Sequence, residues 1–110
     1  MKVNELAQKL DMKILSGKGS DIKDVTGVYV CDLLSWVMSH AEKGNAWITI
    51  HTHLNIVAVA LLTEVSCIII PEDIAVEENT IKKAEEEGII ILSSSLSAYE
   101  LCYRMHKLLV

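Results

Sequence analysis

The segment from Ala46 to Leu62, AWITIHTHLNIVAVALL, constrains the fold more than any other part of the chain. Trp47 to Ile50 form a β-branched and aromatic run of strand length. Ile56 to Leu62 are apolar throughout, as expected for a helix that packs between a sheet and another surface. The segment therefore predicts a buried strand, a polar corner and an apolar helix in direct succession.

Strands and helices also alternate along the rest of the chain. Short strands are predicted near residues 12–15, 25–30, 66–70 and 89–92, and helices over 2–10, 32–40, 78–87 and from Ser97 onward. Asp32 is expected to cap the second of these helices, with an inner face of Leu33, Leu34, Val37 and Met38. Ser97 and Glu100 match a capping box at the start of the last helix.

This alternation predicts one α/β domain over residues 1–110. The expected architecture is a single layer sandwich, in which a mainly parallel sheet of about five strands carries helices on both faces. The composition is 51% hydrophobic and 23% charged, an apolar excess that favours burial of further surface in a homodimer.

Charge and cysteine content exclude several classes of protein. A net charge of −5 with Arg104 as the only arginine argues against nucleic-acid binding. The three cysteines are widely spaced in apolar segments, so they predict neither a disulfide framework nor a zinc cluster and fit a reducing cytoplasm. No signal peptide or membrane-spanning run is recognisable, so no membrane partner is expected.

Polar residues follow four of the predicted strands. Because the carboxyl ends of parallel strands share one edge of a sheet, these residues are expected to surround a ligand crevice near helix N-termini that offer free amide donors. The predicted ligand-binding residues are Asp32, His51, Thr52, His53, Asn55, Ser93 and Ser94. The chemistry of this set suits a small anionic metabolite or a nucleotide.

The spacing of His51 and His53 leaves two interpretations open. Two imidazoles on one side of an extended strand can share a metal ion, with Asp32, Glu72 or Asp73 as a third ligand. Alternatively, one histidine bonds the backbone at the turn and the other is exposed, which is the commoner arrangement. We therefore assign no metal site and no cofactor from the sequence.

Nucleophilic catalysis has weak sequence support. The serines at 93, 94 and 95 lack the glycines of a nucleophile elbow, and serines after a strand usually cap the next helix. Cys31, Cys67 and Cys102 resemble small core residues more than reactive thiols. No catalytic residue is predicted.

Several segments of the chain carry a resemblance to the DRTGG domain. They are residues 16–17, 25–34, 47–56, 68–70, 85–92 and 96–100. The DRTGG domain is a small α/β module that occurs alone, within phosphotransacetylases and within CBS-containing pyrophosphatases, and it is related to the N-terminal half of HPr kinase/phosphorylase. The name-giving residues differ, because this chain has His51, Thr52 and His53 in place of Asp-Arg, and Pro71, Glu72 and Asp73 in place of Thr-Gly-Gly.

The resemblance implies a regulatory or interaction module that self-associates, without kinase activity of its own. The chain is similar to stand-alone DRTGG-domain proteins encoded near iron-iron hydrogenases. This similarity implies a redox or hydrogenase-associated protein as a partner. The leading hypothesis is a cytoplasmic, homodimeric, non-catalytic sensing or adaptor module. The alternative is an enzyme or an accessory enzyme subunit related to transferases or kinases, which would use His51 or His53 with a nearby carboxylate or metal.

Overall fold

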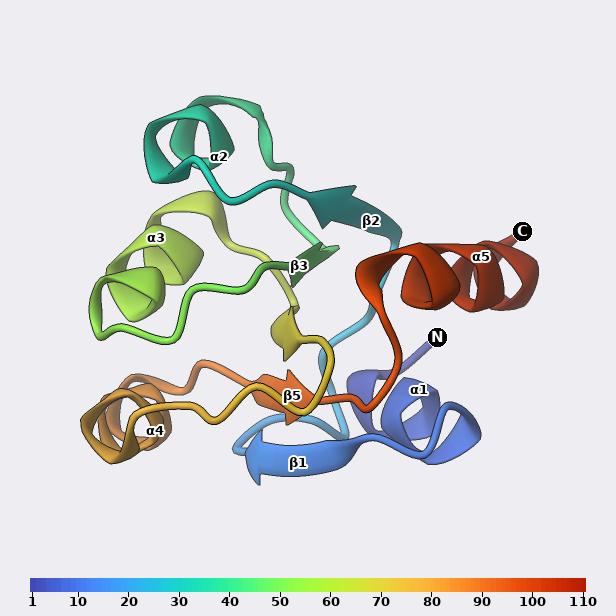
Figure 1. The fold of residues 1–110 in the computed structure, drawn as a ribbon, viewed down its shortest axis with the longest axis horizontal. Coiled ribbons are helices and arrows are strands. Elements are labelled where there is room, and N and C mark those ends of the chain that lie inside the picture. Colours follow the sequence, from blue (N-terminus) through green and yellow to red (C-terminus); the bar gives the residue numbers. More distant parts are fainter.

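Alternating strands and helices build a layered α/β structure in the computed structural model, which describes residues 1–110 (Figure 1). The helices are α1 (Val3–Lys9), α2 (Leu34–His40), α3 (Asn55–Thr63), α4 (Glu78–Glu87) and α5 (Ala98–Leu109). The strands are β1 (Lys13–Ser16), β2 (Gly27–Val30), β3 (Asn45–Ile48), β4 (Cys67–Ile70) and β5 (Ile91–Ser93). The predicted order of elements is confirmed.

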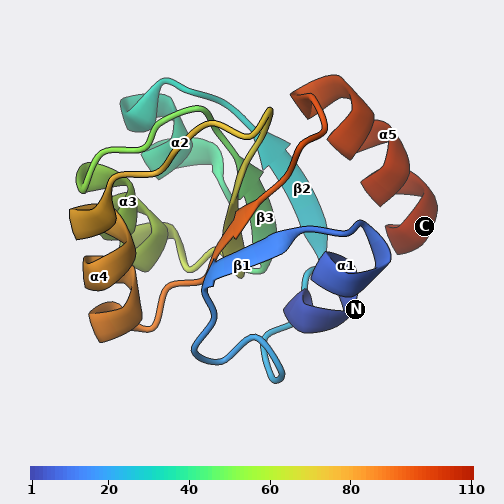
Figure 2. The ribbon, with the colours of Figure 1, turned by 60° about the horizontal axis from the view of Figure 1, so that its bottom comes forward.

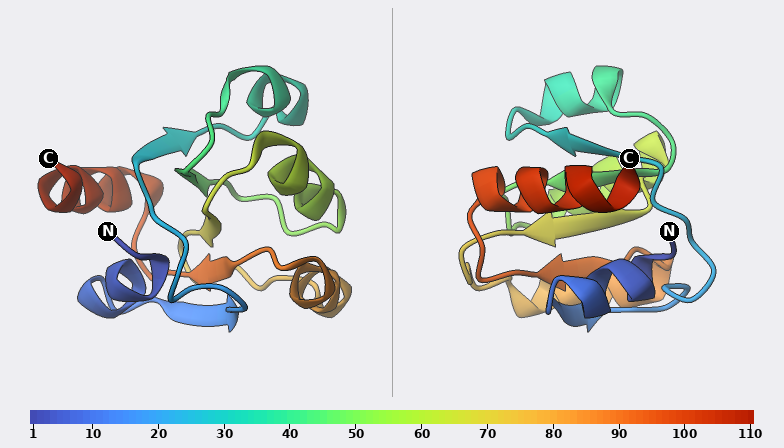
Figure 3. Two further views of the ribbon diagram at one scale, coloured as in Figure 1. Left: turned by 180° about the vertical axis from the view of Figure 1, so that it is seen from behind. Right: turned by 90° about the vertical axis from the view of Figure 1, so that its right-hand side faces the viewer.

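One five-stranded sheet runs through the molecule in the order β1-β5-β4-β3-β2. Strands β2, β3, β4 and β5 are parallel, whereas β1 pairs antiparallel with β5. The carboxyl ends of the four parallel strands therefore lie on one edge, here called the carboxyl edge, and their amino ends lie on the opposite, amino edge. The right-hand view of Figure 3 shows the arrows of β2, β4 and β5 pointing the same way. The prediction of a mainly parallel sheet is confirmed.

Helices cover both faces of the sheet, as Figure 2 shows. Helices α1 and α5 enclose one apolar core with side chains such as Cys67 and Ile69, and α2, α3 and α4 enclose a second with Ile68 and Ile70. Successive residues of β4 thus point to opposite cores, as the twofold period of a strand requires. All four residues of β4 are buried, because the strand is covered on both faces.

Two helices begin or end at residues that the sequence marks as a helix cap or a helix stop. Helix α4 spans Glu78–Glu87 and ends at Gly88, whose φ of 72° lies in the left-handed region that a residue with a Cβ adopts at a cost. The side chain of Ser97 accepts a hydrogen bond from the Glu100 amide at 3.2 Å and so caps α5. The reciprocal half of the capping box is absent, since the Glu100 carboxylate pairs with Arg104 instead.

Two expectations about α2 are wrong. Asp32 does not cap this helix, which begins after Leu33 without a side-chain cap, because the Asp32 carboxylate bonds the end of β3 instead. Val37 is buried as expected, but Leu33 and Met38 are exposed rather than on the inner face. The helix has only seven residues, so it presents little more than Leu34 and Val37 to the core.

None of the five helices is long and apolar enough to cross a lipid bilayer.

Substitution of Ser97 by Ala is expected to lower the free energy of unfolding by about 1 kcal/mol, because the first turn of α5 loses the acceptor for the Glu100 amide. Urea denaturation followed by circular dichroism measures the change. Ser95→Ala is the matched control, since Ser95 is exposed and its hydroxyl makes no hydrogen bond. Equal stability of both variants would contradict a role for this cap.

Candidate functional site

The ends of β2 and β3 are tied together by Asp32. Its Oδ1 atom accepts hydrogen bonds from the buried Thr49 hydroxyl at 2.7 Å and from the Ile50 amide at 3.0 Å. The Trp47 indole N–H adds a bond of 2.9 Å to the Cys31 carbonyl oxygen. The polar corner that follows β3 is therefore anchored to the neighbouring strand by side chains from both segments.

His51 lies against this anchor. Its Nε2 atom hydrogen-bonds the Asp32 carbonyl oxygen, and its amide donates to the Thr49 hydroxyl at 3.3 Å. A carbonyl oxygen only accepts, so Nε2 of His51 carries the proton and Nδ1 remains available as an acceptor in the neutral ring. Of the two arrangements considered for the histidine pair, the structure has the one in which one histidine bonds the backbone and the other, His53, is exposed.

His53 and Asn55 lie together at the start of α3. The Asn55 amide donates to Nδ1 of His53 at 3.4 Å, which leaves Nε2 of the neutral ring as an outward N–H donor. The Ile56 and Val57 amides donate to the carbonyl oxygens of His53 and Leu54. The first three amides of the helix thus have acceptors within a tight local turn, so the free amide donors expected here are absent, and an anion at this corner would be bound by side chains.

An open groove of about 340 Å³ lies beside these two residues, along the outer surface of α3 and next to α4. Its apolar wall comes from α3 and the residue before it, with His53 and Asn55 at one end. Lys83 of α4 also lines the groove, but the surface that faces into the groove is apolar throughout, and the Lys83 ammonium is paired at 3.2 Å with Glu87. The complete lining is His53, Leu54, Asn55, Val57, Ala58, Leu61 and Lys83.

Sequence reasoning missed Lys83 and assigned the charged run of α4 to solvated surface. Lys83 is exposed, as are Lys82 and the glutamates at 85, 86 and 87, whereas Ala84 is buried. Only the packing of α3 against α4 places it beside His53, and such packing has no local signal in the sequence. The hydroxyl of Thr80 on α4 reinforces this packing by donating to the Thr52 carbonyl oxygen at 2.8 Å.

Ser93 and Ser94 lie at the carboxyl edge but apart from the histidines, because β4 separates β5 from β3. Ser94 is buried, and its hydroxyl accepts a bond from the Leu96 amide at 3.0 Å. No hydrogen bond joins either serine to Asp32, His51, Thr52, His53 or Asn55. The seven predicted residues therefore share one edge of the sheet and fall into separate groups along it.

The carboxylates considered as metal ligands are also apart from the histidines. Glu72 and Asp73 are exposed and form the turn after β4, both with a left-handed φ. Their amides bond the carbonyl oxygens of Leu96 and Ser94, so the turn packs toward the β5 side. No three side chains among the His, Cys, Asp and Glu residues are grouped so as to hold a metal ion.

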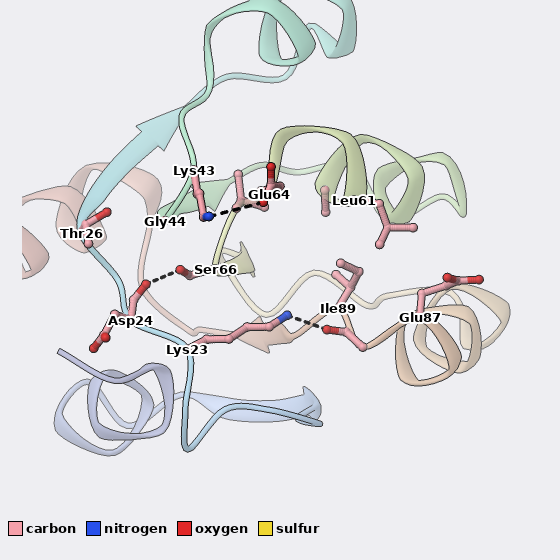
Figure 4. A pocket seen from close by; sticks show the side chains of 13 residues that line it. Lys23, Asp24, Thr26, Lys43, Gly44, Leu61, Glu64, Ser66, Glu87 and Ile89 are labelled. Atoms are coloured by element: carbon pink, nitrogen blue, oxygen red, sulfur yellow. Dashed lines mark hydrogen bonds and ion pairs between the residues drawn. The ribbon is translucent and has the colours of Figure 1, made fainter.

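The main cavity, of about 620 Å³, lies at the opposite, amino edge (Figure 4). Its charged groups already have partners: the Lys23 ammonium donates to the Gly88 carbonyl oxygen at 2.6 Å, and Lys43 pairs with Glu64 at 3.7 Å. The pKa of Asp24 is lowered, chiefly by the hydrogen bond from Lys2. The cavity escaped sequence reasoning because its walls come from the loops before four different strands.

The three cysteines are unpaired. Burial raises the pKa of the Cys67 thiol to about 12, and burial also raises the pKa of Cys102. Cys67 lies in β4 within the core of α1 and α5, where the neutral thiol packs as a small apolar group.

Comparison with known proteins gives one family and one fold. Residues 5–108 match the family model described as the DRTGG domain. No curated protein sequence matches the chain significantly. The structure is similar to the crystal structure of the CBS and DRTGG domains of the regulatory region of Clostridium perfringens pyrophosphatase, complexed with the activator diadenosine tetraphosphate. The TM-score is 0.68 at 12% sequence identity, over 93% of this chain and 44% of that chain.

Asp32→Ala is expected to lower the free energy of unfolding by about 1–3 kcal/mol, because the buried Thr49 hydroxyl loses the acceptor of its proton. Asp32→Asn keeps an oxygen acceptor and should lose less. Asp21→Ala is the surface control, since no hydrogen bond or ion pair involves the Asp21 side chain. A urea titration in which Asp32→Ala and Asp21→Ala coincide would refute the anchoring role of Asp32.

At pH 8 we expect Cys67 to resist alkylation by iodoacetamide in the folded protein, because its pKa of about 12 keeps the thiol protonated and the sheet covers it. Cys31, which is partly exposed, should be modified first. Mass spectrometry of peptides from native and urea-treated samples measures each site. Modification of Cys67 as fast as Cys31 without urea would show that the buried position is wrong.

Proposed function

The chain belongs to the DRTGG domain family, and we propose that it is a non-catalytic regulatory module that binds a small anionic ligand in the groove between α3 and α4. The fold that it shares with the regulatory region of a pyrophosphatase supports a regulatory role. The observation that carries the proposal is the meeting of His53, Asn55 and Lys83 at one apolar groove.

The chemistry of the groove defines the class of ligand. Only apolar surface faces into the groove, so Nε2 of His53, the side-chain amide of Asn55 and the Lys83 ammonium would bind a phosphate or carboxylate as hydrogen-bond donors turned toward it from the border of the groove. The apolar wall formed by Leu54, Val57 and Leu61 suits a ring or an aliphatic body. A volume of about 340 Å³ is near the lower end of small-molecule pockets, which favours a mononucleotide or a smaller anion.

Recruitment of Lys83 would require a change in its present ion pair. The ammonium lies 3.2 Å from Glu87 and 4.0 Å from Glu86, both exposed partners one turn along α4. Exposed pairs of this kind contribute little stability, so an incoming anion can displace the carboxylates at small cost. Three further predicted residues would act indirectly, since Asp32 and His51 hold the corner and Thr52 bonds Thr80 on α4, whereas Ser93 and Ser94 lie apart from the groove.

We further propose that the module acts as a homodimer in a reducing cytoplasm, where its three cysteines stay unpaired. Several large apolar side chains are exposed, which supports self-association. The family resemblance supports a redox or hydrogenase-associated protein as the target of regulation, and co-purification from cells expressing the tagged chain would identify it.

A thermal-shift assay with AMP, ADP, ATP, diadenosine tetraphosphate and inorganic phosphate tests the ligand class. A probe present at 100 times its Kd stabilises the folded state by about 2.7 kcal/mol and so raises Tm by several degrees. His53→Ala, Asn55→Ala and Lys83→Ala should each reduce the shift, because each removes a donor from the border of the groove.

Lys82→Ala is the matched control, since Lys82 is an exposed lysine on the same helix that does not line the groove. It should respond to the probe like the unmodified protein. An unchanged shift in all three groove variants would exclude this groove, and the absence of a shift with every probe would exclude the nucleotide and phosphate class.

A further inference from the structure

The two outer strands of the sheet, β1 and β2, differ in how they are protected against pairing with another chain. Strand β1 at one edge has a register shift between Ile14 and Ser16 and carries the exposed Lys13. Bulges and lysines are the usual means by which proteins prevent an edge strand from pairing with another chain. Strand β2 at the other edge runs in unbroken register with β3 over Gly27–Val30 and has no lysine or proline. Its outer backbone groups have no partner strand, so this edge is open.

The open edge is also free of charge. The chain carries a net charge of −5, so two copies repel each other less when they meet through a surface that adds no like-charge contacts. No acidic or basic residue occurs from Thr26 to Cys31. The charged face of α4, in contrast, contains three consecutive glutamates and would oppose such a contact. Charge therefore favours β2 as the place where a second copy can approach.

A groove of about 400 Å³ runs between β2 and α5. Val28 and Val30 of the strand form one side, and Cys102, His106 and Leu109 of the helix form the other. A strand added to β2 would point alternate side chains toward this face. The groove thus offers space for the apolar side chains of an incoming strand with the same sequence as β2.

Apolar side chains also flank the end of the open strand. Val30 is 47% exposed, and Leu33 and Trp36 follow it in the chain with exposures of 63% and 51%. A four-residue strand pair alone buries less than the roughly 1,200 Å² of a stable interface, so further contacts are needed. Leu33 and Trp36 at the start of α2, together with Val30 and the α5 side of the groove, are the apolar groups available for such contacts.

We infer that β2 pairs antiparallel with β2 of a second copy, so that two five-stranded sheets become one continuous sheet across a twofold axis. An antiparallel pair of identical strands is self-complementary, since each backbone donor meets the matching acceptor of the other copy. The inference rests on the proposed homodimer and specifies its interface.

Val30→Lys and Ile14→Lys form a matched pair for testing this interface. Both place a lysine on an edge strand at an apolar position of nearly equal exposure, 47% for Val30 and 46% for Ile14. Light scattering after size exclusion should give twice the chain mass of 12.2 kDa for the unmodified protein and for Ile14→Lys. Val30→Lys should be monomeric at the same concentration, with circular dichroism confirming that it is folded.

The outcomes separate this inference from the proposed function. A dimer that persists in Val30→Lys overturns the β2 interface while the homodimer stands, and a dimer lost only in Ile14→Lys places the contact at β1. A monomeric unmodified protein overturns both the interface and the homodimer, and leaves ligand binding to be judged by the groove variants.

Hydrogen exchange tests the same interface without a substitution. The amides of Gly27–Val30 that point away from β3 should exchange at least tenfold faster when the protein is diluted to the concentration at which light scattering gives the monomer mass. Amides of Lys13–Ser16 should not respond to dilution. Exchange in β2 that is independent of concentration would overturn the inference even if Val30→Lys proved unstable.

Discussion

The structure depends on a sheet whose inner strands are covered on both faces. The backbone N–H and C=O groups of a strand buried in this way cannot form hydrogen bonds with water. Each inner strand therefore needs a neighbouring strand on both sides. Strand β4 satisfies this condition between β3 and β5, with isoleucines that enter both apolar cores. The loops must then emerge at the two edges, which is why the polar side chains gather at the carboxyl edge and the main cavity lies at the amino edge.

Sequence patterns predicted the elements whose signals are local. Helix α4 has both its amphipathic period and Gly88 as a stop, and α5 has Ser97 as a cap, so the placement of both follows from neighbouring residues. The same reasoning assigned Asp32 wrongly, because a carboxylate just before a helix can cap it or bond another strand. The choice depends on the approach of Thr49, which lies seventeen residues away in the chain.

The candidate site was predictable only in part for the same reason. His53 and Asn55 lie in the polar corner that the sequence predicts between a buried strand and an apolar helix, and both line a groove. Lys83 comes from a helix that packs against α3, and the strand order that separates Ser93 and Ser94 from the histidines is set by long-range pairing. Non-local packing thus determines which of the polar residues are neighbours.

The loop from Thr49 to Asn55 has a consequence for regulation. Its first part is bonded to Asp32 directly after β2, and its last part supplies His53 and Asn55 to the groove beside α3. One short connection therefore joins the segment that follows β2, the strand proposed for self-association, to the groove proposed for the ligand. If occupancy of the groove changes the position of this loop, the two equilibria are linked, and linkage is reciprocal. The apparent affinity for the ligand would then vary with the concentration of the protein itself, so the amount of the module in the cell would set its sensitivity.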